Sequence, residues 1–481
     1  IAIIINGGIN IFSTWFDPNA KALAAIPQVT LAKNTDLPQT DVTHLVMVTQ
    51  GVAAYLGQQA LASNGQNLGS QYHTDPSAYT LQSVNKHLYW VAPLVYNNVW
   101  ANLGNWESPG FVAVDAEDPN VSPVLHTGFH MRYVPGAILN QDLVRHVYLS
   151  GEIFGNLEDP TLEVDDSWRP FYTISYMQPT RGFTGDVVTR VLLADPQTGS
   201  VQSFAPHNVP SWVDRVIPAA VVTQYLTWWG NYHNAPWFNP SGKDQQAPAS
   251  DPELVYNSVD QPVWLVPMTS SARTDKSSTG MVLFSTRDRT ATFYPLAGVG
   301  TGDNVLHTFE SNPHNIRSYD VEGIRLYQIY GEPTWVATFV RQNPFGETFQ
   351  GIGMVSAQHL NGANVVMTDT RADALGQYSQ WLADANIHGN PASGGNIVSL
   401  QGKVTRIAAA TENSNTVYYI LLEGKTVIYK AGLALSAKLP LVQPGDTVNV
   451  TYLDTGQSVV TLTAFDDLSI QTSSLTPGAS R

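Results

Sequence analysis

Adjacent carboxylates and closely spaced histidines are the residues of this chain that first suggest catalysis or metal binding. Asp165 and Asp166 could form an acid–base pair or contribute to a Ca²⁺ site. Because a Ca²⁺ site needs six or more oxygen ligands, the pattern favours a β-turn between strands. His126 and His130 lie four residues apart in a glycine-containing, β-like context, HTGFHMRY, so they need not share a helical face. The zinc-binding pattern HExxH does not occur, and we predict no metal site.

Motifs for a nucleophile or a phosphate-binding loop are also missing from the sequence. The glycine-rich stretch GVGTGDN at 298–304 lacks the lysine and the preceding buried strand of a phosphate loop, which favours a surface loop. No serine lies in a G-x-S-x-G context, although a catalytic triad assembled from distant residues stays open. These observations predict a protein that is not an enzyme, with no catalytic residues and no cofactor.

A dense group of aromatic residues is the best candidate for a binding surface. It consists of Trp228, Trp229, Tyr232, Trp237 and Phe238. Exposed together, such rings would form a platform for a sugar or a partner protein. The alternative, which we favour, is that the end of a helix and the following loop pack between neighbouring units.

Composition limits the possible partners. Of the 481 residues, 43% are hydrophobic and only 13% are charged, a mixture typical of turn-rich β proteins. The formal net charge of −15 disfavours nucleic acid and anionic lipid headgroups. The absence of cysteine excludes disulfides, thiolate nucleophiles and zinc–thiolate sites.

The elements that must position these residues recur along the chain. Proline precedes Tyr172, Trp264 and Trp335 by two residues, and Trp90 has Leu88 at that position. An apolar strand, a polar loop and a second apolar strand follow each aromatic residue, which predicts an antiparallel meander of three or four strands. Proline presets an extended backbone and the aromatic ring fills a core, so we interpret this motif as structural.

Helical patterns lie between the meanders, at 40–61, 138–154, 210–232, 303–319 and 371–386. In 210–232, Pro218 should begin or kink the main helix. Alternation of helix and meander predicts an α+β protein in which helices cover one face of small antiparallel sheets.

The composition changes after a flexible linker at 388–395. Five alternating strands within 396–470 predict a small Greek-key barrel that resembles an oligonucleotide/oligosaccharide-binding (OB) fold. Tyr418, Tyr419, Tyr429 and Tyr452 could stack on bases. However, residues 396–481 contain six basic and six acidic residues, so they form no basic groove, and we predict no nucleic-acid binding.

The first five residues are apolar, and two interpretations are open. They could form a short buried strand, or they could end a transmembrane helix that begins ahead of Ile1, since five residues cannot span a bilayer. The predicted boundaries are 1–35 for this N-terminal segment, 36–135, 136–209, 210–300 and 301–388 for four modules, 396–470 for the barrel and 471–481 for a tail.

Two resemblances support this organisation. The stretches LEVDDSWRPFYTISYM (162–177) and VVTRVLLADPQTGSVQSF (187–204) resemble a PepSY-like module. The wider chain, with segments such as LYWVAPL (88–94) and DLVRHVY (142–148), is similar to an uncharacterised family of membrane-anchored bacterial envelope proteins. That resemblance implies an extracytoplasmic location in the cell envelope and an anchoring helix ahead of Ile1. Ser285 and Ser356 depart from the pattern, since they stand where the PepSY-like module has aspartate.

Together these features predict a non-enzymatic structural or scaffold protein of a cell envelope or surface assembly. Tandem PepSY-like modules and a terminal OB-like barrel would contact protein partners in a homo-oligomer or larger assembly. One alternative is a ligand- or glycan-binding envelope protein that uses the region from Trp228 to Phe238. Another is a PepSY-type protease regulator, which rests on the resemblance alone.

Overall fold

The structure is a computed structural model. It describes residues 17–33, 37–63, 68–97, 107–137, 139–182, 184–234, 243–257, 261–271, 278–296, 299–300, 302–315, 317–344, 346–385, 387, 396–412, 415–454 and 458–470. Residues 1–16 of the predicted N-terminal segment, the predicted linker at 388–395 and the predicted tail at 471–481 lie outside these residues. No helix in the described ranges is long and apolar enough to cross a membrane.

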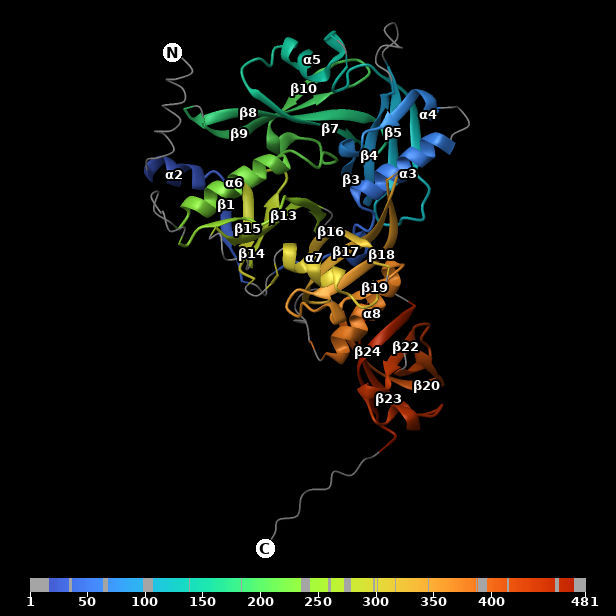
Figure 1. The fold of residues 1–481 in the computed structure, drawn as a ribbon. Coiled ribbons are helices and arrows are strands. Elements are labelled where there is room, and N and C mark those ends of the chain that lie inside the picture. Colours follow the sequence, from blue (N-terminus) through green and yellow to red (C-terminus); the bar gives the residue numbers. More distant parts are fainter. Residues whose placement is uncertain are drawn as a thin grey trace.

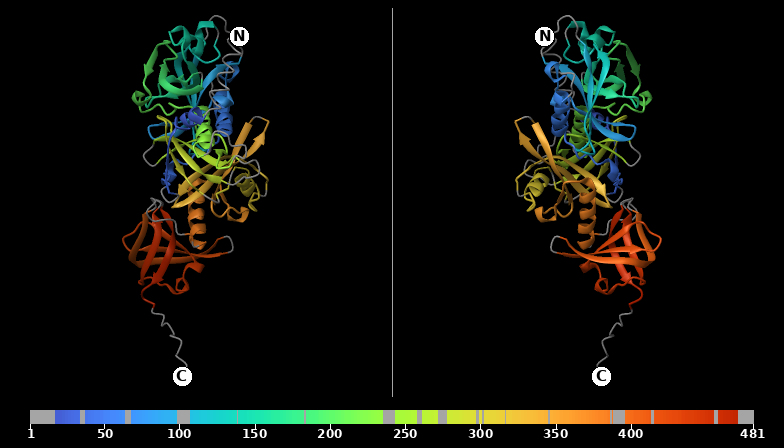
Figure 2. Two further views of the ribbon diagram at one scale, coloured as in Figure 1. Left: turned by 90° about the vertical axis from the view of Figure 1, so that its left-hand side faces the viewer. Right: turned by 90° about the vertical axis from the view of Figure 1, so that its right-hand side faces the viewer.

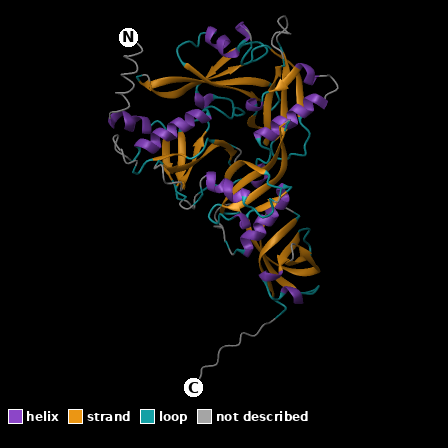
Figure 3. Ribbon diagram, in the orientation of Figure 1, coloured by secondary structure: helices purple, strands orange, loops and turns teal. Residues whose placement is uncertain are grey.

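The described chain is mostly β, which contradicts the predicted α+β class. Strands account for 47% of it and helices for 22%, with seven α-helices among the described residues (Figure 3). The strands form four antiparallel-rich sheets and a closed barrel. The prediction of tandem PepSY-like modules, each a helix laid on its own meander, is therefore wrong.

The first two sheets pack against each other in a sandwich-like manner. One has the order β2-β4-β5-β6, with β3 also paired to β4, and the other has the order β10-β9-β8-β7. Phe111 of β5 and Ile174 of β8 are both fully buried in the core that the two sheets share. The first sheet buries its other face against α3 (Gln50–Ser63), so the meander packs on a second sheet as well as on a helix. The strands are β2 (Tyr72–Thr74), β3 (Thr80–Val84), β4 (His87–Tyr96), β5 (Ser108–Asp115), β6 (Val124–Met131), β7 (Asn156–Val164), β8 (Pro170–Arg181), β9 (Thr184–Ala194) and β10 (Val201–Phe204).

The third sheet includes β1, a strand from the N-terminal part of the chain. Its order is β1-β15-β14-β13-β11, with β12 paired to β13, and β1 lies parallel to β15. Helices α2 (Asp17–Ala24) and α6 (Ala219–Tyr232) lie side by side against it (Figure 1). The predicted helix start after Pro218 is confirmed. The strands are β1 (Gln28–Leu31), β11 (Gln246–Pro248), β12 (Glu253–Tyr256), β13 (Pro262–Ser270), β14 (Ser278–Ser285) and β15 (Thr290–Tyr294).

The fourth sheet has the order β16-β17-β18-β19 and lies between the other sheets and the barrel (Figures 1 and 2). Trp335 of this sheet shares a core with Met281 of the third sheet. The strands are β16 (Asp320–Ile329), β17 (Glu332–Asn343), β18 (Gly346–Ser356) and β19 (Val366–Thr368). Helices α7 (Gly302–Glu310) and α8 (Arg371–Asp384) pack on this sheet, and α8 also contacts the barrel.

The C-terminal strands close into a five-stranded barrel, which forms one end of the molecule (Figure 2). Their order is β20-β21-β22-β24-β23, and β22 and β24 pair in parallel. Tyr429, Val448 and Leu462 are among the buried residues that fill its interior. The strands are β20 (Asn396–Glu412), β21 (Asn415–Leu422), β22 (Ile428–Gly432), β23 (Thr447–Asp454) and β24 (Val459–Asp467).

The predicted helix at 40–61 is only partly present. Helix α3 (Gln50–Ser63) begins ten residues later than predicted, and Leu45 to Val48 form a buried connection instead. The backbone N–H groups of Met47 and Val48 both donate to Ala116 O, and Trp90 Nε1 donates to Val48 O (2.8 Å). These long-range bonds satisfy the buried backbone without a helix. The remaining helices are α4 (Leu68–Gln71), α5 (Leu143–Leu149) and the short 3₁₀ turns η2 (Val42–His44), η3 (Pro76–Ala78), η5 (Leu139–Gln141), η6 (Pro206–Asn208), η7 (Gly362–Asn364), η8 (Leu433–Leu435) and η9 (Leu439–Leu441).

Candidate functional site

Asp165, His126 and His130 make structural contacts. Asp165 Oδ1 accepts hydrogen bonds from the backbone N–H groups of Ser167 (2.8 Å) and Arg169 (2.9 Å), which confirms the turn before β8. His126 stacks on Trp168, with ring centroids 4.4 Å apart, whereas His130 pairs with Glu107 at 3.1 Å. The described residues contain no group of three or more side chains that could hold a metal ion.

The aromatic cluster is divided by the fold. Trp229 is only 3% exposed and packs in the core near Phe293, with ring centroids 5.4 Å apart. Trp228 is half-buried beside Tyr225 in α6, and Tyr232 is half-buried at the end of that helix. Trp237 and Phe238 lie outside the described residues. The burial of Trp229 favours the packing interpretation for that ring.

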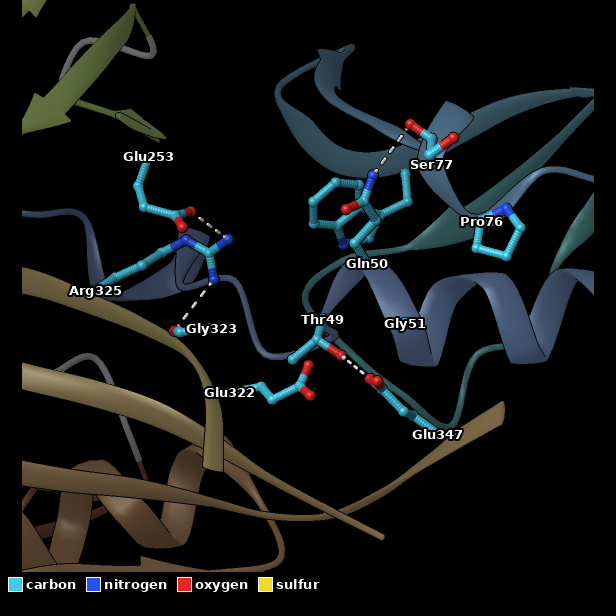
Figure 4. A pocket seen from close by; sticks show the side chains of 11 residues that line it. Thr49, Gln50, Gly51, Pro76, Ser77, Glu253, Glu322, Gly323, Arg325 and Glu347 are labelled. Carbon is cyan, nitrogen blue, oxygen red and sulfur yellow. Dashed lines mark hydrogen bonds and ion pairs between the residues drawn. The ribbon is translucent and has the colours of Figure 1, made fainter. Parts of the chain in front are cut away.

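An acidic pocket between β16, β18 and the start of α3 brings together residues that are distant in the sequence. Its volume is about 420 Å³, and it is lined by Thr49, Gln50, Gly51, Pro76, Ser77, Trp90, Glu253, Glu322, Gly323, Arg325 and Glu347. Three glutamates and one arginine supply its charge. Figure 4 shows the carboxylates of Glu322 and Glu347 turned toward each other beside Thr49.

A bulge in β16 places two of these side chains in the pocket. In a regular strand, Glu322 and Arg325 would point to opposite faces, because they are three residues apart. The pairing with β17 shifts register between these two residues, and Gly323 has a φ of +60°. A bulge of this kind redirects side chains, so both residues line the same pocket.

Glu347 reaches the pocket from the hairpin that joins β17 and β18. Gln342 Nε2 donates to Glu347 Oε1 (3.0 Å) and to Glu322 Oε1 (3.5 Å), so one amide contacts both carboxylates. Thr49 Oγ1 donates to Glu347 Oε2 (3.4 Å) and accepts from the backbone N–H of Val52 (3.1 Å) at the start of α3. The carboxylate thus lies at the N-terminal end of a 14-residue helix, where the helix dipole favours negative charge.

The pKa of Glu322 lies above that of an ordinary glutamate. Burial, the charge of Glu347 and a hydrogen bond with Glu347 raise the pKa of Glu322 to about 7. The raised pKa follows from physical necessity, since two close carboxylates cannot both ionise without strong repulsion. Near neutral pH Glu322 is therefore partly protonated.

Arg325 forms the opposite wall of the pocket. Its side chain is buried, and Nη2 pairs with Glu253 Oε2 at 2.9 Å, while Nη1 donates to Gly323 O (3.3 Å). Its Nε–H has no hydrogen-bond partner in the described part of the chain. A buried donor without a partner is costly, so this N–H is a place where a ligand acceptor would be stabilised.

The pocket can bind a cation, and it can move a proton. A cationic group would fit between Glu322 and Glu347 and favour the ionised form of Glu322, and the Trp90 ring offers an aromatic wall to it. The same pair could also serve as general acid and base. The sequence does not single out these glutamates, because none of them lies in a distinctive local motif. The one local signal is Gly323, since a glycine inside a strand pattern indicates a bulge.

No protein-family model matches the chain, and the search of curated proteins also gives no match. The resemblance to PepSY-like modules and to an envelope protein family therefore stays a hypothesis.

Proposed function

We propose that this chain is a non-enzymatic scaffold or adaptor protein that binds a basic side chain of a protein partner in the acidic pocket. The observation that carries the proposal is the carboxylate pair Glu322–Glu347, one member of which has a pKa near 7. A lysine or arginine side chain supplies the positive charge that this pair lacks. The overall charge of −15 would also attract basic partners.

The unpartnered Nε–H of Arg325 favours a peptide over a free amine as the ligand. A backbone carbonyl next to the basic side chain could accept this hydrogen bond while the side chain reaches the two glutamates. The two glutamates would bind the positive charge of the side chain, and Arg325 Nε–H would donate to the neighbouring carbonyl. The extracytoplasmic location and the membrane anchor also belong to this proposal, and they rest on the family resemblance alone.

The test is calorimetric titration of the full chain with three capped tripeptides, acetyl-Ala-Xaa-Ala-amide, in which Xaa is lysine, norleucine or glutamate. We expect binding of the lysine peptide, with protons released near pH 7, and no binding of the other two. Changing both glutamates, Glu322→Gln and Glu347→Gln, should weaken binding about tenfold or more, because each charged hydrogen bond contributes about 1.5–3 kcal/mol.

Glu423→Gln is the matched control, since Glu423 is an exposed glutamate of the barrel. Equal binding of the norleucine and lysine peptides would contradict the proposal. Mass spectrometry of the same mixtures tests the alternative chemistry, because cleavage of the peptide would show that the pair acts as an acid–base catalyst.

A further inference from the structure

A second cavity lies next to the acidic pocket, across the short turn η3. Its volume is about 330 Å³, within the range of small-molecule sites. Ser77 of η3 lines both cavities. The second cavity is bounded by β4 of the first sheet, the connection at 134–137 and strands β7 and β8 of the second sheet.

The walls of this cavity expose more apolar than polar surface, although His73, Thr80, Tyr96 and Ser108 also line it. Leu94 and Leu162 come from the two facing sheets, and Pro93, Pro135, Ala137 and Pro160 add rigid or small apolar surface. Leu94, Ala137 and Leu162 are buried, so much of the lining is fixed by the cores of the sheets. Such a shape suits an apolar molecule with few rotatable bonds.

One polar group of the lining has no partner. Tyr172, on β8, is 1% exposed, and its hydroxyl forms no hydrogen bond with any described residue. Burial raises the pKa of Tyr172 well above its usual value, so the hydroxyl stays protonated and can donate. A buried hydroxyl without a partner costs free energy that an incoming acceptor would recover.

The rim of the cavity carries negative charge. Asp75 and Asp159 both line it. Asp75 Oδ1 accepts from Ser77 Oγ (2.7 Å) and from Ser77 N (2.9 Å), and these bonds lower the pKa of Asp75. The lowered pKa keeps Asp75 ionised, and its negative charge would repel an anionic ligand.

We propose that this cavity binds a small neutral molecule that has an apolar body and one carbonyl-type acceptor, which accepts a hydrogen bond from Tyr172 Oη. The proposal is independent of peptide binding in the acidic pocket, because it depends on neither Glu322 nor Glu347. The ligand chemistry follows from three features: an apolar lining, one unpartnered donor and an acidic rim.

Three probes of similar size test these features separately. They are 4-phenyl-2-butanone, butylbenzene, which lacks the carbonyl, and 3-phenylpropanoate, which is an anion. NMR titration of the full chain should give the tightest binding for the ketone and the weakest for the anion. A crystal structure with the ketone should place its oxygen at Tyr172 Oη.

Two variants complete the test. Tyr172→Phe removes only the unpartnered hydroxyl, so the fold should persist; it should weaken ketone binding about fivefold and leave butylbenzene binding unchanged. Ala137→Leu should fill the cavity and reduce binding of both, with thermal unfolding used to check that each variant is folded. The proposal is overturned if Tyr172→Phe affects both probes equally, or if an ordered water stays on Tyr172 Oη at saturating ketone.

Discussion

Gly51 and Glu347 lie so close together that no side chain fits at position 51 unless the carboxylate moves. Gly51 belongs to the first turn of α3, whereas Glu347 is the second residue of β18. A glycine in one element thus fixes the position of a charge in another. The obstructing atoms are the end of a flexible side chain, which can rotate away at little cost in stability.

Gly51→Ala should therefore separate binding from stability. Alanine would displace the Glu347 carboxylate from the pocket and weaken binding of the lysine peptide about tenfold, the loss expected for one charged contact. Stability should stay within about 1 kcal/mol of the wild type, since alanine also favours the helix. Peptide titration and urea unfolding measure the two effects.

Gly376→Ala is the control for this experiment. Gly376 lies within α8, and a methyl group there meets no other atom within 4 Å. This variant should gain about 0.5–1 kcal/mol of stability and bind peptide as the wild type does. A Gly51→Ala protein that binds normally would show that Glu347 does not contact the ligand.

The raised pKa of Glu322 predicts a dependence of stability on pH. Its folded pKa is about 7, above the value of about 4.3 for an unfolded glutamate, so the folded state binds more protons between these pH values. The contribution of Glu322 to the free energy of unfolding is greatest below the unfolded pKa, and it is lost as the pH rises through 7. Glu322→Gln removes this titration. At pH 8 the free energy of unfolding of the variant should exceed that of the wild type by about 1 kcal/mol, after allowance for solvent screening.

Urea unfolding of both proteins at pH 8 and at about pH 4 measures this difference. The gap should close at the lower pH, where Glu322 is protonated in both states. A gap that is the same at both pH values would show that the amide acts through packing and not through charge.

The positions of strands could be predicted from the sequence, but the fold class could not. Trp90, Tyr172, Trp264 and Trp335 are all buried strand residues, because a proline or apolar residue before an aromatic ring is a strong local signal. The packing of one sheet against another leaves no local signal in the sequence. The contact between the sheets of Phe111 and Ile174 depends on the tertiary arrangement, which no local sequence pattern records.

The residues of the acidic pocket also could not be predicted from the sequence. Thr49, Glu322 and Glu347 are brought together by a helix start, a bulge and a hairpin that lie far apart in the chain. The adjacent pair Asp165–Asp166 had the more conspicuous pattern and proved to form a turn. Carboxylates form a site when the fold juxtaposes them, and adjacency along the chain is a poor guide to that.

A second buried carboxylate pair, Glu163 and Asp214, should be essential for stability. Asp214 Oδ2 accepts from Ser83 N (2.9 Å) and Tyr256 Oη (2.6 Å), and Asp214 N donates to Glu163 Oε2 (2.7 Å). These bonds join strands of three sheets. Asp214→Ala would remove the acceptor of the buried Tyr256 hydroxyl and the hydrogen bond from Ser83 N, at a cost of about 3 kcal/mol in urea unfolding.

Asp466→Ala is the comparison for that variant. Asp466 pairs with Lys438 at 2.7 Å on the barrel surface and is 54% exposed, so its removal should cost under about 1 kcal/mol. Burial also raises the pKa of both Glu163 and Asp214, so the wild type should lose stability as the pH rises above the usual carboxyl range. Equal costs for the two aspartate variants would refute the structural role of the buried pair.

The aromatic cluster can be tested by treating its members separately. Trp229 is buried against Phe293, so Trp229→Ala should lower the free energy of unfolding by about 3–5 kcal/mol. Tyr232 is half-buried, and Tyr232→Ala should cost about 1 kcal/mol. Loss of glycan binding in Trp229→Ala would therefore say nothing about recognition, because the fold itself is weakened.

Tyr232→Ala and Trp237→Ala are the informative variants for a glycan-binding role. Titration with soluble oligosaccharides should show no binding by the wild type if the cluster is only packing. Binding that Tyr232→Ala abolishes, in a variant that loses no more than the expected 1 kcal/mol or so of stability, would instead assign the end of α6 to a ligand surface. In that case the protein would have a recognition surface separate from the acidic pocket, because Glu322→Gln should leave glycan binding intact.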